Sequence, residues 1–211
     1  MFITFEGIEG CGKTTQLRRF VKRLKSRGIS LVMTLEPGGT RIGKDIRKIL
    51  LDSRNKNLSS LAELILYAAD RAQHVEEVIK PALEEGKWVV CDRFLDATVV
   101  YQGMARGQDM ELVRVLNEKA TQGIRPDITY LLDCPADMGL ARALKRNEAQ
   151  SQEGQDRFER EALDFHKAVR QGYLDLARED QDRYVIIDAT LPKDEVEAVI
   201  FQHIEQYLKE D

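Results

Sequence analysis

One glycine-rich stretch near the amino terminus limits the possible folds more than any other part of the sequence. It runs from Gly7 to Thr14, reads GIEGCGKT and fits the pattern G-x-x-x-x-G-K-[ST]. The apolar segment FITFE precedes it, and a helical pattern follows it. Glycines let backbone N–H groups turn toward phosphate oxygens, and the N-terminus of a helix favours an anion. The stretch therefore predicts a strand, a phosphate-binding loop and a helix in direct succession.

The same loop predicts a bound nucleotide and its metal ion. Lys13 offers a mobile positive charge to the β- and γ-phosphates, and the Thr14 hydroxyl is a ligand for Mg²⁺. A second metal ligand is expected to be acidic and to follow an apolar strand, and both Asp92 and Asp133 do so. Asp92 is followed at once by Arg93. The guanine-specificity sequence N-K-x-D does not occur in the chain, which disfavours a signalling GTPase.

Apolar and helical patterns alternate along the chain. Five stretches dense in β-branched or aromatic residues predict strands that are buried on both faces, as in a parallel sheet: 2–6, 30–35, 87–92, 128–133 and 183–188. Helical patterns occur around 17–24, around 42–50, and over 60–79, 109–122, 136–146, 157–178 and 193–208. Ser60 and Glu63 are expected to form a capping box. We therefore predict a doubly wound α/β fold with its functional loops at the carboxyl ends of the strands.

Length and composition fit one domain that spans residues 1–211. The net charge is -4 and the basic residues are spread along the chain, so no basic stripe predicts a nucleic-acid partner. The three cysteines, Cys11, Cys91 and Cys134, have no metal-ligand spacing and are expected to be buried thiols in a reducing compartment. Neither a signal peptide nor an apolar run of membrane-spanning length is evident, and we expect a cytoplasmic protein without a membrane partner.

One polar segment differs from the rest of the chain. Residues 147–156, NEAQSQEGQD, are almost without hydrophobic side chains. Basic residues flank the segment: Arg142, Lys145 and Arg146 before it, and Arg157 and Arg160 after it. A solvated surface loop is one interpretation. A mobile lid over about 142–160, which carries arginines to a bound nucleotide, is the other.

Five motifs, taken together, resemble the thymidylate kinase family over essentially the whole chain. They are FEGIEGCGKTTQ, EPGGT (36–40), YAADRAQH (67–74), DRFLDATVVYQG (92–103) and DRFE (156–159). EPGGT and the DRF…YQG block are far more restrictive than the phosphate-binding loop. The resemblance implies a P-loop NTPase fold, a five-stranded parallel sheet with helices on both faces and a small lid. It also implies a homodimer that phosphorylates dTMP to dTDP with ATP and Mg²⁺, which supplies dTTP for DNA replication.

The resemblance also assigns the substrate-binding residues. For ATP they are Gly7, Ile8, Glu9, Gly10, Cys11, Gly12, Lys13, Thr14 and Thr15. Thr14 and Asp92 are implied as the metal ligands. For dTMP they are Glu9, Glu36, Arg47, Tyr67, Arg71, Arg93, Thr98, Tyr101 and Gln102.

Each dTMP residue has an implied role. Tyr67 stacks on thymine, Arg71 binds the O4 carbonyl, and Thr98 bonds the edge of the base. Glu9 faces the 3′-hydroxyl, Tyr101 packs against the sugar, and Gln102 lies close by. Arg93 and Arg47 clamp the phosphate, and Glu36 orients these arginines. Tyr67 and Arg71 are four residues apart on one predicted helix, so they are expected to share a face.

The catalytic residues implied by the resemblance are Lys13, Arg93, Arg146 and Arg157. Relatives without an arginine in the phosphate-binding loop carry it in the lid, and this loop has Cys11 at that place. The lid is longer than the usual R-G-x-x-D-R connection, so the arginine that contacts the transferred phosphate stays open. A phosphate acceptor is largely a dianion at neutral pH and needs no general base. His74, His166 and His203 are therefore expected to be structural.

Three other functions stay open at this point, and another nucleoside monophosphate kinase is the first of them. A deoxynucleoside kinase shares the phosphate-binding loop and an Asp-Arg motif, but it needs a general base for a neutral hydroxyl. A P-loop binding module without turnover would have no use for a lid with paired arginines.

Overall fold

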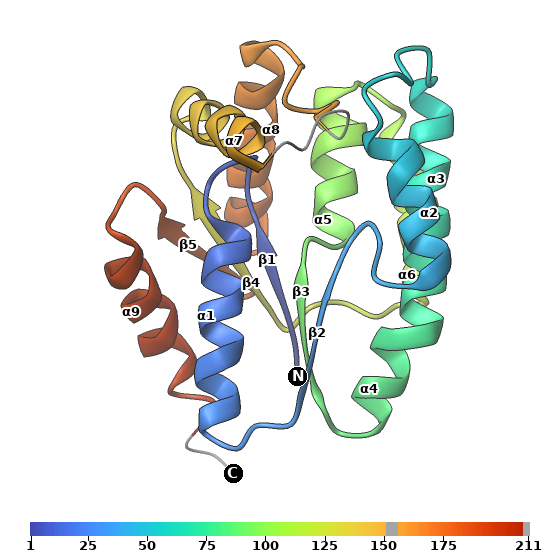
Figure 1. Cartoon of the computed structure of the whole chain (residues 1–211). Coiled ribbons are helices and arrows are strands. Elements are labelled where there is room, and N and C mark those ends of the chain that lie inside the picture. Colours follow the sequence, from blue (N-terminus) through green and yellow to red (C-terminus); the bar gives the residue numbers. More distant parts are fainter. Residues whose placement is uncertain (151–155, 209–211) are drawn as a thin grey trace.

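The computed structural model describes residues 1–150 and 156–208, and its centre is a five-stranded parallel sheet (Figure 1). The strands are β1 (Phe2–Glu6), β2 (Leu31–Leu35), β3 (Trp88–Asp92), β4 (Ile128–Asp133) and β5 (Tyr184–Asp188), in the order β2-β3-β1-β4-β5. Every neighbouring pair is parallel. The predicted strands are confirmed, each to within one residue at either end.

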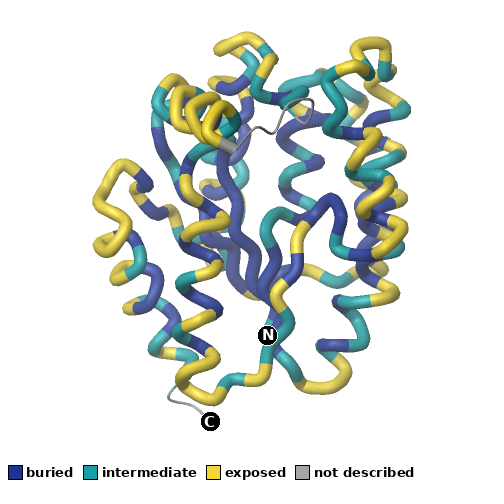
Figure 2. Tube along the Cα trace, in the orientation of Figure 1, coloured by how far each residue is buried: buried dark blue, intermediate teal, exposed yellow. Residues whose placement is uncertain are grey.

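Burial explains why these segments form strands. β1 is buried along its whole length, and β3 and β4 are buried up to their last residue, whereas the edge strands β2 and β5 are partly exposed. Figure 2 shows the buried sheet at the centre of the molecule, with exposed residues on the outer helices. Strands covered on both faces need continuous apolar runs, because neither face meets water. The doubly wound α/β fold is therefore confirmed.

Helices follow the strands. They are α1 (Lys13–Ser26), α2 (Arg41–Leu51), α3 (Ser60–His74), α4 (Lys80–Glu84), α5 (Leu95–Thr98), α6 (Met110–Thr121), α7 (Ala136–Gln150), α8 (Leu163–Glu179) and α9 (Lys193–Ile204). Two π-helical segments, η1 (Val75–Ile79) and η2 (Val99–Ala105), join α3 to α4 and prolong α5. α1 packs beside α9 on one side of the sheet, and α8 packs against η2. None of the described helices is long and apolar enough to cross a membrane.

Three local predictions need correction. Ser59, not Ser60, caps α3 by accepting from the N–H of Ala62, and Glu63 is buried and does not close a capping box. Its carboxylate instead meets side chains from η2 and from the segment after residue 155. The helix predicted over 157–178 begins only at Leu163, because residues 157–160 form turns that hold Arg157 against the core. The α5–η2 segment, 95–105, was not predicted as helical.

Candidate active site

A cavity of about 1020 Å³ opens at the carboxyl ends of the strands, where the functional loops were expected. All nine residues predicted to bind dTMP line this cavity, and so do Thr14 and Asp92. Of the loop predicted to bind ATP, residues 9–15 line it, whereas Gly7 and Ile8 do not. Among the four residues predicted to be catalytic, Lys13, Arg93 and Arg146 line the cavity and Arg157 does not.

Backbone geometry shapes the phosphate-binding loop. Gly7 has φ +136° and Gly10 has φ +70°, and a Cβ atom at either position would collide with a backbone carbonyl oxygen. Only glycine fits both positions. The Ile8 side chain is buried in the hydrophobic core. Gly7 and Ile8 therefore anchor the start of the loop to the core. Lys13 Nζ donates to their carbonyl oxygens, at 2.9 Å to Gly7 and 2.7 Å to Ile8.

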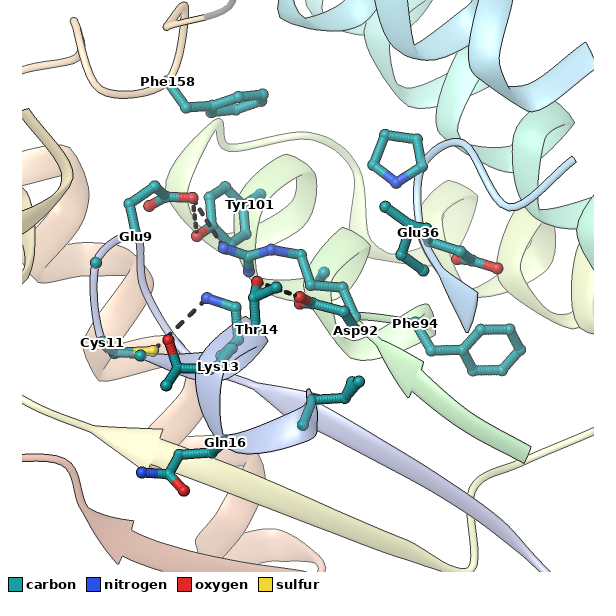
Figure 3. Close-up of a pocket in the computed structure, with 18 of the residues that line it drawn as sticks. Glu9, Cys11, Lys13, Thr14, Gln16, Glu36, Asp92, Phe94, Tyr101 and Phe158 are labelled. Carbon is teal, nitrogen blue, oxygen red and sulfur yellow. Dashed lines mark hydrogen bonds and ion pairs between the residues drawn. The ribbon is translucent and has the colours of Figure 1, made fainter. Parts of the chain in front are cut away.

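Thr14 and Asp92 face each other at the edge of the cavity (Figure 3). Thr14 Oγ1 donates to Asp92 Oδ2 at 2.7 Å. A hydroxyl and a carboxylate are hard oxygen ligands of the kind that Mg²⁺ takes, and Mg²⁺ needs few protein ligands because water and phosphate complete its shell. The other candidate, Asp133, is bound by two N–H groups of Arg170 at 2.7 and 2.8 Å, which favours Asp92. Within residues 1–150 and 156–208, no group of three or more His, Cys, Asp or Glu side chains could hold a metal ion.

Arg93 follows Asp92 directly and has an unusual backbone conformation. Its φ is +70°, which costs free energy for a residue with a side chain and which clusters at functional sites. Nη2 donates to Glu9 Oε1 at 2.9 Å, and Nη1 donates to the Tyr173 hydroxyl at 3.0 Å. The guanidinium also lies over the Tyr101 ring, 4.9 Å from its centroid. The guanidinium is thus held on three sides while it lines the cavity.

Glu9 turns away from the phosphate-binding loop and toward Arg93. Oε1 accepts from Arg93 and from the Tyr101 hydroxyl at 2.7 Å (Figure 3), and Oε2 lies 3.4 Å from His166 Nδ1. Burial alone would raise the pKa of Glu9, but Arg93, His166, Lys13 and Tyr101 together hold it well below its ordinary value. The carboxylate therefore stays charged and fixed on the Arg93 side of the cavity.

Arg71 is the large polar side chain at the base of the cavity, and it is 1% exposed. Its Nε donates to Glu36 at 2.9 Å, its Nη1 to Asn117 at 2.7 Å, and its Nη2 to the Phe94 carbonyl at 3.1 Å. A guanidinium carries five N–H groups, so two are left to donate to a ligand. Asn117 lies on α6, outside every motif that the sequence singled out.

The partner of Glu36 differs from the prediction. Glu36 was expected to orient Arg93 and Arg47, but it binds Arg71 and, at 2.9 Å, His74 Nδ1. Glu36 is itself buried, and a buried carboxylate needs charged or donor partners on the same side. Arg47 donates instead to the Pro37 carbonyl at 2.8 Å. Burial lowers the pKa of Arg47.

The remaining predicted dTMP residues also line the cavity. Thr98 is buried, and its Oγ1 has no hydrogen-bond partner among the residues that the structure describes. Burial raises the pKa of Tyr67, which stays protonated with its ring at the cavity wall. Gln102 is buried, and its amide donates to Glu63 at 2.9 Å. They come from α3, α5 and η2, and Tyr101 on η2 lines the cavity as well.

The two arginines that flank the polar segment behave differently. Arg146 on α7 is half-exposed, lies 3.1 Å from Glu159 and reaches the cavity. Arg157 lies 2.6 Å from the buried Glu63 and donates to the Leu50 carbonyl at 2.5 Å, and it does not line the cavity in this structure. The ion pair with the buried Glu63 keeps the Arg157 guanidinium outside the cavity. Residues 151–155 of the predicted lid lie outside the described residues.

Several residues of the site were missed from the sequence. Phe94, Phe158 and Glu159 line the cavity, and Tyr173 and His166 on α8 contact Arg93 and Glu9. His166 was expected to be only structural, yet it touches a residue of the site. In the sequence, α7 and the polar segment separate α8 from β4. No local pattern therefore indicates which residues of the site α8 contacts, because tertiary packing determines these contacts.

Comparisons with known proteins identify this arrangement. A family model described as thymidylate kinase matches residues 5–200. The chain is 59% identical over 197 residues to a thymidylate kinase of Desulfosudis oleivorans, which covers 93% of this chain and 92% of the relative. It is 51% identical over 208 residues to one of Pelobacter propionicus, with 98% and 95% covered.

A solved structure supports the same assignment at the level of the fold. The crystal structure of a thymidylate kinase from Ehrlichia chaffeensis superposes with a TM-score of 0.77 at 33% identity, over 97% of this chain and 98% of the other. The strand order, the phosphate-binding loop and the cavity at the carboxyl edge fit a P-loop NTPase fold. The chain belongs to the thymidylate kinase family.

Proposed function

We propose that this chain transfers the γ-phosphoryl group of ATP to dTMP and releases dTDP and ADP. One observation carries the proposal: a guanidinium clamp, Arg93 with Glu9, lies in the same cavity as the Thr14–Asp92 pair and Lys13. A cation aimed at an acceptor phosphate therefore lies beside the ligands of the donor phosphates and their metal. A deoxynucleoside kinase would instead need a general base for a neutral hydroxyl, and family membership does not favour it.

On the acceptor side, each residue has a role that its chemistry supports. Tyr67 stacks on thymine, Arg71 donates an N–H to O4, and the Thr98 hydroxyl, which has no hydrogen-bond partner among the described residues, bonds the edge of the base. Glu36 fixes Arg71 in the orientation that this contact needs. Thymine has an acceptor at O4 where cytosine has an amine donor, so a fixed donor selects the base.

A second set of side chains binds the sugar and the phosphate of dTMP. Glu9 accepts from the 3′-hydroxyl, and Tyr101 and Gln102 pack around the deoxyribose. Arg93 and Arg47 bind the phosphate, because a planar guanidinium donates to two oxygens at once. A phosphate monoester has a second pKa of about 6, so the nucleophile is a dianion that no side chain has to deprotonate.

On the donor side, residues 7–15 hold ATP. The Thr14 hydroxyl and the Asp92 carboxylate are the ligands for Mg²⁺, which neutralises charge on the phosphates when it is bound. Lys13 exchanges the carbonyls of Gly7 and Ile8 for the β- and γ-phosphates. Positioning and charge stabilisation then account for most of the rate, because phosphoryl transfer needs little covalent chemistry from a protein.

Arg146 and Arg157 belong to the proposed lid and have different roles in our proposal. Arg146 already faces the cavity, and we assign it to the transferred phosphoryl group. Arg157 forms an ion pair with Glu63, and through this pair it anchors the carboxyl-terminal end of the lid to α3. This refines the prediction that both arginines contact the phosphates.

The assay that tests the proposal compares acceptors at fixed ATP and Mg²⁺, with ADP release as the readout. Turnover should be fastest with dTMP, slower with dUMP and negligible with thymidine. Equal or faster turnover with thymidine would contradict the proposal, because thymidine has no phosphate for Arg93. Replacing Mg²⁺ by EDTA should abolish turnover with every acceptor.

We also propose a homodimer in the cytoplasm. Ile42 and Ile49 on α2 and Leu61 and Ile65 on α3 are 44–50% exposed, and α2 packs against α3. Exposed apolar side chains on neighbouring helices favour a protein interface. The three buried free thiols suit a reducing compartment. Light scattering should give twice the monomer mass for the natural chain and a smaller mass for Ile65→Glu; a monomeric natural chain would contradict the dimer.

A further inference from the structure

Beneath the cavity, one buried carboxylate is not explained by the proposed function. Glu6 is the last residue of β1, is 0% exposed and does not line the cavity. Its Oε2 accepts from the Tyr173 hydroxyl at 2.6 Å, and its Oε1 accepts from the Phe94 N–H at 2.7 Å. A fully buried carboxylate is costly, so a reason for this one is needed.

Both partners of Glu6 lead to Arg93. The Tyr173 hydroxyl that donates to Glu6 also accepts from Arg93 Nη1 at 3.0 Å. Phe94 is the residue after Arg93, so the bond to its N–H fixes the peptide that follows the strained φ of +70°. Glu6 thus holds the guanidinium through Tyr173 and the backbone through Phe94.

The charges around Glu6 agree with this geometry. Burial raises the pKa of Glu6 to about 7; Arg93 lowers it, Asp96 raises it, and the bonds from Tyr173 and Phe94 lower it. Arg93 therefore lies between two carboxylates, Glu9 at the cavity and Glu6 behind it. A guanidinium held directly by Glu9 and, through the Tyr173 hydroxyl, by Glu6 keeps one orientation before any ligand binds.

We propose that Glu6 and Tyr173 are positioning residues that aim the Arg93 guanidinium at the acceptor phosphate. Neither lines the cavity, so both act through Arg93. The inference rests on the proposed role of Arg93 as the phosphate clamp. It adds two residues from distant parts of the chain, 167 positions apart, to the machinery for dTMP.

Two substitutions remove the contacts between Glu6, Tyr173 and Arg93 but keep the size and shape of the replaced side chain. Tyr173→Phe removes only the hydroxyl between Arg93 and Glu6. Glu6→Gln replaces one acceptor by an amide donor, so it cannot accept from both the Tyr173 hydroxyl and the Phe94 N–H. The control is Tyr130→Phe, because Tyr130 is also a fully buried tyrosine, with its hydroxyl 3.0 Å from His203 Nδ1.

The readout is the ratio of the dissociation constants of thymidine and dTMP, measured by calorimetry at pH 8 without ATP. Only dTMP carries the phosphate, so a misaimed Arg93 lowers this ratio and leaves thymidine binding unchanged. We expect Tyr173→Phe and Glu6→Gln each to lower the ratio about tenfold, the scale of a hydrogen bond to a charged group. The double variant should be no worse than either single one, and Tyr130→Phe should keep the natural ratio.

The outcomes separate this inference from the proposal on which it rests. Arg93→Ala must also lower the ratio; if it does not, the clamp itself is wrong. If Arg93→Ala lowers the ratio but Tyr173→Phe leaves it unchanged, or weakens dTMP and thymidine equally, the positioning role is overturned. Should Tyr173→Phe fail to fold, Glu6→Gln decides by the same criterion.

Discussion

The two ends of the cavity are built differently. At the end proposed to bind dTMP, two of the three arginines are held by carboxylates: Arg71 by Glu36, and Arg93 by Glu9. At the end proposed to bind ATP, Lys13 donates to carbonyls of its own loop, and the half-exposed Arg146 pairs with Glu159. We therefore expect the acceptor end to keep its arrangement when a ligand binds, and the donor end to change its contacts when ATP binds.

The difference has a physical origin. A guanidinium in a buried wall has to be paired, because an unpaired buried charge costs several kcal/mol. The pairing also fixes its direction, which suits recognition of one base and one phosphate. A cation that stabilises transferred charge must instead approach after both substrates have bound, so that water is excluded at that moment. Each prediction below sets one end against the other.

Arg93→Ala should have the largest effect, because it removes the phosphate clamp and leaves Glu9 without its main cation. We expect kcat/KM for dTMP to fall by about 10³ or more, as for other charge-stabilising groups in phosphoryl transfer. ATP affinity should persist, since the donor loop is untouched. Steady-state kinetics and ATP titration check this, with Arg23→Ala, whose guanidinium lies over Phe201 on α9, as the control. Retained dTMP phosphorylation would refute the clamp.

Arg146→Ala should impair the donor end alone. We expect the single-turnover rate to fall about 100-fold with unchanged dTMP affinity, on the scale of a lost transition-state cation. Arg157→Ala is the matched variant: it should lower the melting temperature more and the rate less, because it removes the shorter of two ion pairs of the buried Glu63 and leaves the one with Arg106. A larger loss of rate in Arg157→Ala than in Arg146→Ala would reverse the assignment.

Arg71→Lys should loosen base selection at the acceptor end. A lysine cannot keep the contacts to Glu36, Asn117 and the Phe94 carbonyl together and still reach a base. We expect the preference for dTMP over dCMP to fall about tenfold or more, with the KM for ATP unchanged. Arg47→Lys serves as the comparison, since it should weaken dTMP binding without changing base preference. Unchanged discrimination in Arg71→Lys would contradict the role.

Glu6→Gln should change the pH dependence of stability. Burial raises the pKa of Glu6 from 4.5 to about 7, so the folded chain holds this proton more tightly than the unfolded chain. The resulting stability is complete below pH 4.5 and is lost as the pH rises through 7, by at most about 3 kcal/mol. Urea unfolding of Glu6→Gln should show a flatter profile between these values. Asp70, whose pKa is raised to about 6, stays in both proteins. Identical profiles would show that Glu6 does not titrate in this range.

Much of this molecule follows from local sequence pattern. The strands were predicted because segments buried on both faces need dense β-branched and aromatic residues, as in ITYLLD at β4. The phosphate-binding loop was predicted because its glycines satisfy a backbone requirement inside one short segment. All nine dTMP residues that the resemblance implied line one cavity, although Arg47 lies on α2 and Tyr67 and Arg71 lie on α3.

The errors and omissions concern contacts between distant segments. Tyr173 lies 80 residues from Arg93, and Asn117 lies 46 from Arg71, with no local signal to link them. Glu63 fits a capping box by spacing, but the interior offers it Gln102 and Arg157, which only the folded chain brings together. Burial and the pairing of charges determine which contacts these side chains make, and both are properties of the tertiary structure.

The most direct test of a preformed acceptor end is the binding of dTMP and thymidine to the natural chain without ATP. If Arg93 is already aimed, dTMP should bind at least about tenfold more tightly than thymidine, as expected for a charge-assisted bidentate contact, and Arg93→Ala should abolish the difference. Equal affinities in the natural chain, or a preference for dTMP that arises only after an ATP analogue is added, would contradict the account.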